Sequence, residues 1–120
     1  MIKLRNIKKS FGPLEVLHGV SLDVAKGEIV SIVGASGAGK STLLQIAGSL
    51  MLPDSGDVVV EGVSLSSLDD GALSMFRNRR IGFIFQDYHL LAEFSAQENV
   101  MMPMLIAGVG RREAGARADE

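Results

Sequence analysis

The sequence predicts an α/β fold, and three observations indicate it. Two segments near the N-terminus alternate apolar and polar residues, two later runs are rich in β-branched and aromatic residues, and apolar residues recur at helical spacing around those runs. Strands and helices that follow one another in this way are typical of a sheet covered by helices. A chain of 120 residues has room for one small domain of this kind.

Composition and charge exclude several classes of protein. With 47% hydrophobic residues, 14 glycines and no cysteine, the chain is not disordered, collagen-like or held together by disulfides. The net charge is −2, so no overall positive field attracts nucleic acid or an anionic membrane. No apolar stretch reaches the roughly 20 residues of a spanning helix, and the N-terminus has no secretion-signal pattern. We expect a cytoplasmic chain without nucleic-acid partners or direct membrane insertion.

Five segments are expected to form strands. Residues 2–7 and 20–24 alternate apolar and polar side chains, as half-buried antiparallel strands do. Residues 29–33 form a near-continuous apolar run that predicts a central strand covered on both faces, and residues 81–85 form a second such run. After a turn, residues 58–63 carry valines that continue as strand.

Helices are expected between and after these strands. Apolar residues at helical spacing predict a helix from Lys40 onward. Ser67, with Asp70 three residues later, predicts a second helix start, and Ser95 with Glu98 forms the capping-box pattern of a third. Residues 111–120 are helix-like but polar, with no stop signal and no apolar face, which indicates an interrupted element.

A glycine-rich loop carries the clearest chemical signal. Residues 34–41 read G-A-S-G-A-G-K-S and match G-x-x-x-x-G-K-[ST] at every fixed position, between a predicted buried strand and an amphipathic helix. A glycine-rich turn that only caps a helix is the alternative, but capping does not select lysine and serine after Gly39. The pattern predicts a phosphate-binding loop.

The loop chemistry assigns a role to each residue. Gly37 and Gly39 let the backbone wrap a phosphate with its N–H groups inward. The Lys40 ammonium reaches the β- and γ-phosphates, the Ser41 hydroxyl ligates Mg²⁺, and Thr42 lies toward the α-phosphate. The residues expected to contact the nucleotide here are Gly34, Ser36, Gly37, Ala38, Gly39, Lys40, Ser41 and Thr42. Such a loop identifies phosphates but not a reaction, because kinases, GTPases and transport ATPases all use it.

Segments spread over almost the whole chain resemble the N-terminal half of an ABC transporter ATPase. They are Lys-Ser-Phe-Gly at 9–12, residues 16–22, residues 27–34 leading into the loop, Pro-Asp-Ser-Gly at 53–56, Phe-Ile-Phe-Gln at 83–86, and Glu-Asn-Val at 98–100. Residues 30–40, 77–78 and 90–96 are most similar to the LolD type, the ATP-binding subunit of lipoprotein-releasing exporters, with MacB-like and FtsE-like subunits as neighbours.

The resemblance implies the fold in more detail. It implies a P-loop NTPase fold of the ABC ATPase type, with an N-terminal antiparallel β-subdomain and part of a parallel core sheet with helices. Residues 1–120 would then be the N-terminal part of one nucleotide-binding domain, including the start of its helical subdomain, and the domain would be truncated.

Three further residues take roles from this resemblance. Phe11 corresponds to the aromatic that stacks on adenine, and Val16 to an apolar neighbour of the base. Gln86 corresponds to the glutamine whose amide oxygen reaches Mg²⁺ or the attacking water. The catalytic candidates are therefore Lys40 and Gln86, and the expected metal ligands are Ser41 and Gln86. Read from the residues alone, Phe11 is also a plausible core residue and Gln86 a plausible solvated loop residue.

The resemblance also implies partners. The segment from Asp87 to Val100 would face membrane-spanning exporter subunits through an exposed apolar patch, and two nucleotide-binding domains would form a homodimer that binds two ATP. The protein would lie at the inner face of the cytoplasmic membrane, attached through its transporter partner. The patch residues are Tyr88, His89, Leu90, Leu91 and Phe94.

The chain lacks motifs that the family places later in the domain. A signature motif of the Leu-Ser-Gly-Gly-Gln type, an acidic strand end with the catalytic glutamate, and a switch histidine are absent from the sequence. We therefore expect binding of ATP and Mg²⁺ with negligible hydrolysis by this chain, and an ABC-type ATPase for the complete protein. Two alternatives are a soluble P-loop nucleotide kinase and a non-catalytic nucleotide-binding fragment.

Other conspicuous side chains have structural interpretations. His18 and His89 have no neighbouring metal-type ligands, so no zinc site is expected. The methionines at 101, 102 and 104 have the helical spacing of core or interface residues, and the arginines at 77, 79 and 80 suit the solvated C-terminal end of a helix.

Overall fold

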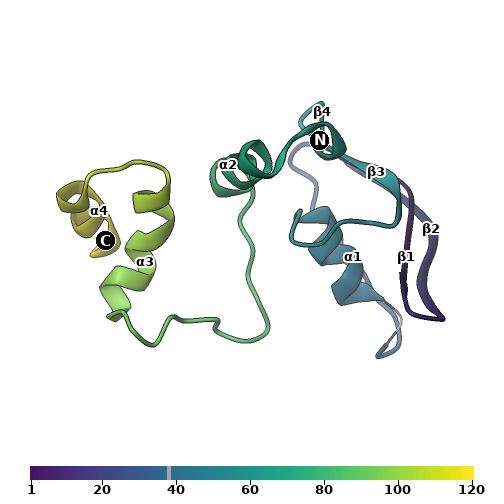
Figure 1. The fold of residues 1–120 in the computed structure, drawn as a ribbon, viewed down its shortest axis with the longest axis horizontal. Helices are drawn as coiled ribbons and strands as arrows, with labels where there is room; N and C mark the ends of the chain where they lie inside the picture. The colour runs from purple at the N-terminus through teal and green to yellow at the C-terminus, as the bar shows by residue number, and fades with distance from the viewer. Residues whose placement is uncertain (38) are drawn as a thin grey trace. The chain divides into compact units, whose positions relative to one another are not determined.

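The computed structural model describes residues 1–37 and 39–120 of the chain, which divide into two compact units, residues 1–73 and 74–120. The first unit contains an antiparallel sheet with one helix, and the second contains helices joined by loops (Figure 1). The loop residue Ala38 lies outside the described residues.

An antiparallel four-stranded sheet of order β2-β1-β3-β4 dominates the first unit. Leu4 of the central strand pairs with Leu22 on one side and with Val58 on the other. The strands are β1 (Ile2–Phe11), β2 (Leu14–Val24), β3 (Ser55–Val60) and β4 (Val63–Ser64). The predicted antiparallel strands 2–7 and 20–24 are therefore confirmed and are longer than the alternation pattern indicated. The predicted strand 58–63 is interrupted, because a turn at Glu61 and Gly62 separates β3 from β4.

The core of the first unit lies between this sheet and α1 (Lys40–Ala47), which runs alongside the strands in Figure 1. Ile46 of α1 and Val58 of β3 line the same small apolar pocket. The buried apolar residues of the unit are Leu4, Ile7, Leu17, Leu43, Ile46, Val58, Val60 and Leu65. Leu17, near the start of β2, lies beside Gly39, so burial of these side chains holds the start of β2 against the start of α1.

Two predicted strands are not present. Residues 29–33 and 81–85 have no strand assignment, and Ile29 and Ile84 are 95% and 98% exposed. Their apolar composition suits a buried strand, but a strand also needs a neighbour that pairs its N–H and C=O groups. Within residues 1–37 and 39–120, every pairing of the sheet is antiparallel and involves neither run, so the expected parallel strands are not formed there.

The second predicted helix starts later than expected. A short 3₁₀ turn, η1 (Leu65–Ser67), comes first, and α2 (Asp70–Arg80) begins three residues after Ser67. Asp69 is the residue that caps α2, because its Oδ1 accepts the Ala72 N–H at 2.8 Å. The arginines of the last turn of α2 lie where cations complement the helix dipole, as predicted.

Helices α3 (Ala96–Ile106) and α4 (Arg111–Ala118) pack together in the second unit. The capping box of Ser95 and Glu98 is confirmed. Met101 of α3 and Ala114 of α4 are buried, so α4 does have a small apolar face, contrary to the expectation from its polar sequence. In the part of the chain that the structure describes, no helix combines the length and apolar character needed to cross a membrane.

Candidate phosphate-binding site

The glycine-rich loop adopts a backbone that only glycine accommodates easily. Gly37 has φ +81° and Gly39 has φ +90°, both in the left-handed region. At Gly39 space is restricted as well, because a Cβ there would lie 2.9 Å from both Leu17 Cδ2 and Val16 Cγ1. Position 39 therefore favours glycine for two independent reasons, its left-handed backbone conformation and its close contact with β2.

The N-terminal end of α1 is open toward an anion. Gly39 is the N-cap, its carbonyl accepts the Leu43 N–H at 2.9 Å, and no side-chain hydrogen bond caps the helix. The first-turn N–H groups, those of Lys40, Ser41 and Thr42, have no carbonyl partner within the helix. Together with the positive end of the helix dipole, they provide the donors that a phosphate group needs.

Lys40 folds back over the loop. Its ammonium donates a hydrogen bond to the carbonyl oxygen of Gly34, at the other end of the motif. The structure thus brings the first and the seventh residue of the predicted motif together around the loop. Ser36 and Gly37 form an exposed turn between them. A phosphate oxygen inside the loop would be a stronger, charged acceptor for the same ammonium group.

The donor chemistry around α1 fits a magnesium ion. The Ser41 side chain is exposed and directly follows Lys40. Mg²⁺ in phosphate sites keeps several waters and takes one or two protein oxygens, so one hydroxyl is sufficient. Among residues 1–37 and 39–120, no group of three or more histidine, aspartate and glutamate side chains is placed to hold a metal.

The predicted ligand Gln86 belongs to the second unit, where it is exposed and follows the extended run 81–85. Its part in the site stays a prediction.

Phe11 is accessible at the end of β1. Its side chain is 46% exposed, so the alternative that it is a core residue is wrong. The Lys9 ammonium lies 5.6 Å from the centroid of the Phe11 ring, within the range of a cation–π contact. Val16, the second residue expected near a base, is half-buried and lies beside Gly39. An apolar side chain of β2 therefore contacts the loop.

Asp54 supports the end of β1, a role that sequence analysis missed because the residue was recognised only as part of a turn. Its carboxylate accepts the Ser10 N–H at 2.7 Å and lies 3.3 Å from the Lys9 ammonium. These bonds, the Ser10 N–H first, hold the pKa of Asp54 below the ordinary aspartate range. Asp54 therefore orients the two residues that precede Phe11.

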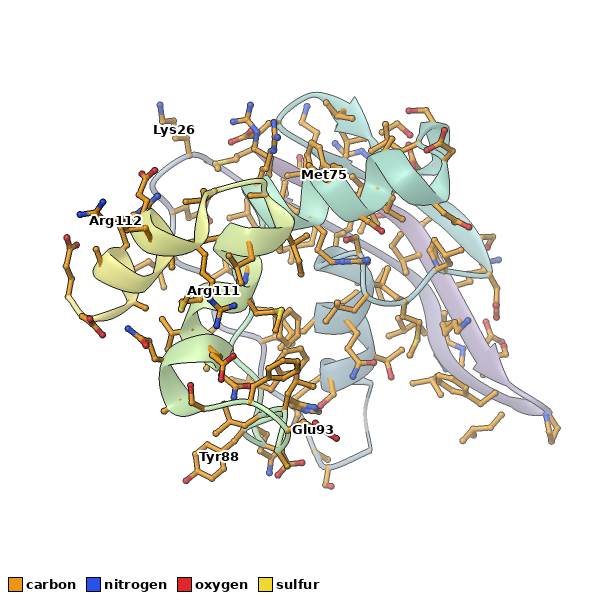
Figure 2. All side chains as sticks on the ribbon, turned by 60° about the vertical axis from the view of Figure 1, so that its left-hand side comes forward. Lys26, Met75, Tyr88, Glu93, Arg111 and Arg112 are labelled. Atoms are coloured by element: carbon orange, nitrogen blue, oxygen red, sulfur yellow. The ribbon has the colours of Figure 1, made fainter. Side chains whose placement is uncertain are left out.

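The predicted apolar patch is exposed. Tyr88 is 91% exposed and its ring points away from the ribbon in Figure 2, and Leu90 is 68% exposed. Leu91 and Phe94 are less exposed, at 45% and 42%. The His89 ring packs against the Phe85 ring at a tilt of 53°, with centroids 4.3 Å apart. This agrees with its predicted structural role.

Comparison with known families gives a match over most of the chain. The family described as "ABC transporter" matches residues 17–120, which include the loop, most of the first unit and the whole of the second.

Relatives with high sequence identity carry one name. The chain is 58% identical to the lipoprotein-releasing system ATP-binding protein LolD of Bacteroides thetaiotaomicron, over 100% of this chain and 55% of the relative. It is 56% identical to LolD of Porphyromonas gingivalis, over 99% of this chain and 54% of the relative. It is 51% identical to LolD of Geobacter metallireducens, over 100% of this chain and 55% of the relative. The chain thus spans about half the length of these relatives.

A solved structure shares the fold. The ATP-binding cassette MJ0796, in a dimeric post-hydrolysis state bound to ADP and Pi, matches with a TM-score of 0.90 and 38% sequence identity, covering 98% of this chain and 54% of that one. A second dimeric structure of MJ0796, described as a bacterial ABC transporter cassette, matches with the same TM-score. The expected fold class and the resemblance to the LolD type are therefore confirmed.

Proposed function

Because this chain belongs to the ABC transporter family, we propose that it supplies the ATP-binding loop of an exporter that releases lipoproteins from the cytoplasmic membrane. The observation that carries the proposal is the geometry around α1: two left-handed glycines, an uncapped helix start and a lysine folded over the loop. The high identity to LolD proteins supports the lipoprotein-releasing role. The soluble nucleotide kinase has no comparable support, since the family match covers residues 17–120.

The loop binds the triphosphate through charge and main-chain donors. The N–H groups of the first turn of α1 donate to phosphate oxygens, and the Lys40 ammonium exchanges the Gly34 carbonyl for the β- and γ-phosphates. Ser41 would hold the magnesium ion, with Gln86 as its second protein ligand. When bound, the ion neutralises charge on the β- and γ-phosphates.

The base is held by residues at the end of the sheet. Phe11 presents its ring for stacking on adenine, and Val16 adds apolar contact beside Gly39. Stacking of an aromatic side chain on a base contributes about 1–3 kcal/mol, which corresponds to about 5- to 150-fold in affinity. Lys9 and Asp54 keep this end of β1 in place.

Partners follow from the same assignment. Two such domains bind two ATP at their interface, and the segment from Asp87 to Val100 docks on the membrane-spanning subunits. Its exposed apolar side chains, Tyr88 and Leu90 above all, support this role, because apolar loop residues gain from a partner that covers them. The domain would work at the inner face of the cytoplasmic membrane through that contact. For residues 1–120 alone, we expect nucleotide binding without appreciable hydrolysis.

Calorimetric titration with ATP and Mg²⁺ tests the proposal. The chain should bind the nucleotide, and Lys40→Ala should weaken binding by about 10- to 150-fold, since a charge-assisted hydrogen bond is worth roughly 1.5–3 kcal/mol. Lys26→Ala, at an exposed lysine outside the loop, is the matched control and should bind as the wild type does. Equal affinities for the Lys40→Ala and wild-type chains would refute the assignment. Lys40-dependent hydrolysis by the chain alone would contradict the expectation of binding without turnover.

A further inference from the structure

The side chain of Asn99, in the first turns of α3, makes four hydrogen bonds to the backbone that precedes the helix. Its Oδ1 accepts the Leu91 N–H at 2.8 Å. The two hydrogens of its Nδ2 are shared among three carbonyl oxygens, those of Leu91 at 3.1 Å, Phe94 at 3.3 Å and Ser95 at 2.9 Å. A single side chain therefore holds both ends of the turn at residues 91–95.

Only a carboxamide of this length can make this set of bonds. The amide of Asn99 pairs with both backbone groups of Leu91, as a neighbouring strand would, and this requires an acceptor and a donor on one planar group. A carboxylate of the same shape has no hydrogen to donate, so it would face three carbonyl oxygens without a bond to them. Its charge would repel these oxygens as well.

This arrangement is not needed to begin the helix. The N-terminal end of α3 is already satisfied by the capping box, in which the Glu98 N–H donates to Ser95 Oγ at 3.1 Å and the Ser95 N–H donates to Glu98 Oε1 at 3.1 Å. Glu98 also accepts a bond from Arg111 of α4 at 3.4 Å. Asn99 therefore acts on the loop rather than on the helix.

The other end of the segment is held by aromatic rings. The tilted rings of Phe83 and Phe85 have centroids 4.5 Å apart, and the His89 ring packs at a tilt against Phe85 with centroids 4.3 Å apart. His89 has φ +51°, an uncommon left-handed conformation for a residue with a side chain. Between the aromatic stack and the Asn99 bonds, Leu90 remains 68% exposed.

We propose that Asn99 is a positioning residue that holds the segment Asp87 to Phe94 in the conformation that its membrane partner recognises. The inference rests on the proposed function, which assigns this segment to the partner contact. A segment that is ordered before binding loses less conformational entropy on binding, so its affinity is higher for the same contacts. Asn99 itself need not touch the partner.

Hydrogen exchange on the isolated chain gives the first test. In Asn99→Ala, the Leu91 amide should exchange at least about 10-fold faster, because its acceptor is removed, whereas amides within α3 should keep their protection. Gln97→Ala is the matched control on the same helix, since Gln97 bonds to Gly115 and Asp119 and not to the segment. Unchanged exchange at Leu91 would overturn the proposal.

Binding to the detergent-purified membrane-spanning subunit of the exporter gives the second test. Both Asn99→Ala and the nearly isosteric Asn99→Asp should bind about 10-fold more weakly. Arg112→Ala, at an exposed residue of α4 outside the docking segment, is the control for this assay and should bind as the wild type does. A role in packing alone would leave Asn99→Asp unaffected. The dissociation constant for ATP distinguishes a local change from misfolding, because misfolding would raise it as well.

The outcomes separate this inference from the function on which it rests. If the wild-type chain fails to bind the membrane-spanning subunit, the partner assignment fails and this inference fails with it. If the wild-type chain and both Asn99 variants bind equally, the partner assignment stands and only the positioning role is refuted.

Discussion

Replacing Gly39 with alanine tests how the loop is built. The new Cβ would lie 2.9 Å from Leu17 Cδ2 and Val16 Cγ1 and 3.2 Å from the Val16 carbonyl oxygen, at a φ of +90°. The backbone strain costs about 1–2 kcal/mol, and the overpacking about 1–3 kcal/mol. Val16 is stiff about χ1 and Leu17 is almost fully buried, so neither methyl group moves aside easily. We expect a loss of about 2–5 kcal/mol from a total stability of roughly 5–15 kcal/mol.

Urea unfolding measures this loss, and Gly62→Ala is the matched control. Gly62 has φ +78°, but a Cβ there would meet nothing within 4 Å, so its replacement carries the backbone strain alone. The difference between the two variants isolates the overlap with β2. Gly39→Ala should also weaken ATP binding by about 10-fold or more, because displaced N–H groups lose charge-assisted hydrogen bonds. Equal losses of stability in the two alanine variants would refute the close-packing argument.

Three further predictions concern the stability of β3, of the end of β1 and of α2. Gly56→Ala should destabilise the chain more than Gly39→Ala in the same unfolding assay, because its Cβ would collide with backbone carbonyl oxygens of β1, which cannot move aside as a side chain can. The pKa of Asp54 is lowered, first of all by the Ser10 N–H, so the ionised carboxylate stabilises the fold at pH values above the ordinary aspartate pKa, and this stabilisation is lost as the pH falls through the lowered pKa. Asp54→Asn should therefore flatten the acid side of a plot of unfolding free energy against pH. An unchanged plot would contradict this prediction. Asp69→Ala removes the acceptor of the Ala72 N–H and should lower the stability of α2 by about 0.5–2 kcal/mol. Hydrogen exchange should then be faster for amides in the first turn of α2, and equal exchange would show that the cap is unimportant.

The backbone geometry of the glycine-rich loop could be predicted because it depends on residues that are close in sequence. A phosphate site of this kind is made from consecutive backbone N–H groups, and Gly37, Gly39 and Lys40 are close in sequence. The same holds for the capping box at Ser95, which depends on a spacing of three residues. Such features need no information about distant parts of the chain.

Features that depend on non-local contacts were predicted less well. The runs 29–33 and 81–85 have the composition of buried strands, but composition cannot supply the neighbouring strand whose backbone groups they would pair with. Ser67 matches the pattern of a helix start, yet the 3₁₀ turn before α2 places the cap at Asp69 instead. Asn99 gave no signal of its own, because its bonds exist only once the turn at 91–95 has formed.

By itself, the sequence determined the glycine-rich loop motif, the antiparallel strands and the family resemblance, since each depends on short runs of residues whose spacing has a direct physical meaning. Only the tertiary structure decided that β2 closes over Gly39, that Asp54 supports the strand end that carries Phe11, and that Asn99 holds the exposed segment before α3. These contacts join residues that come together through packing and backbone hydrogen bonding, and such partners follow from the folded chain rather than from any local pattern.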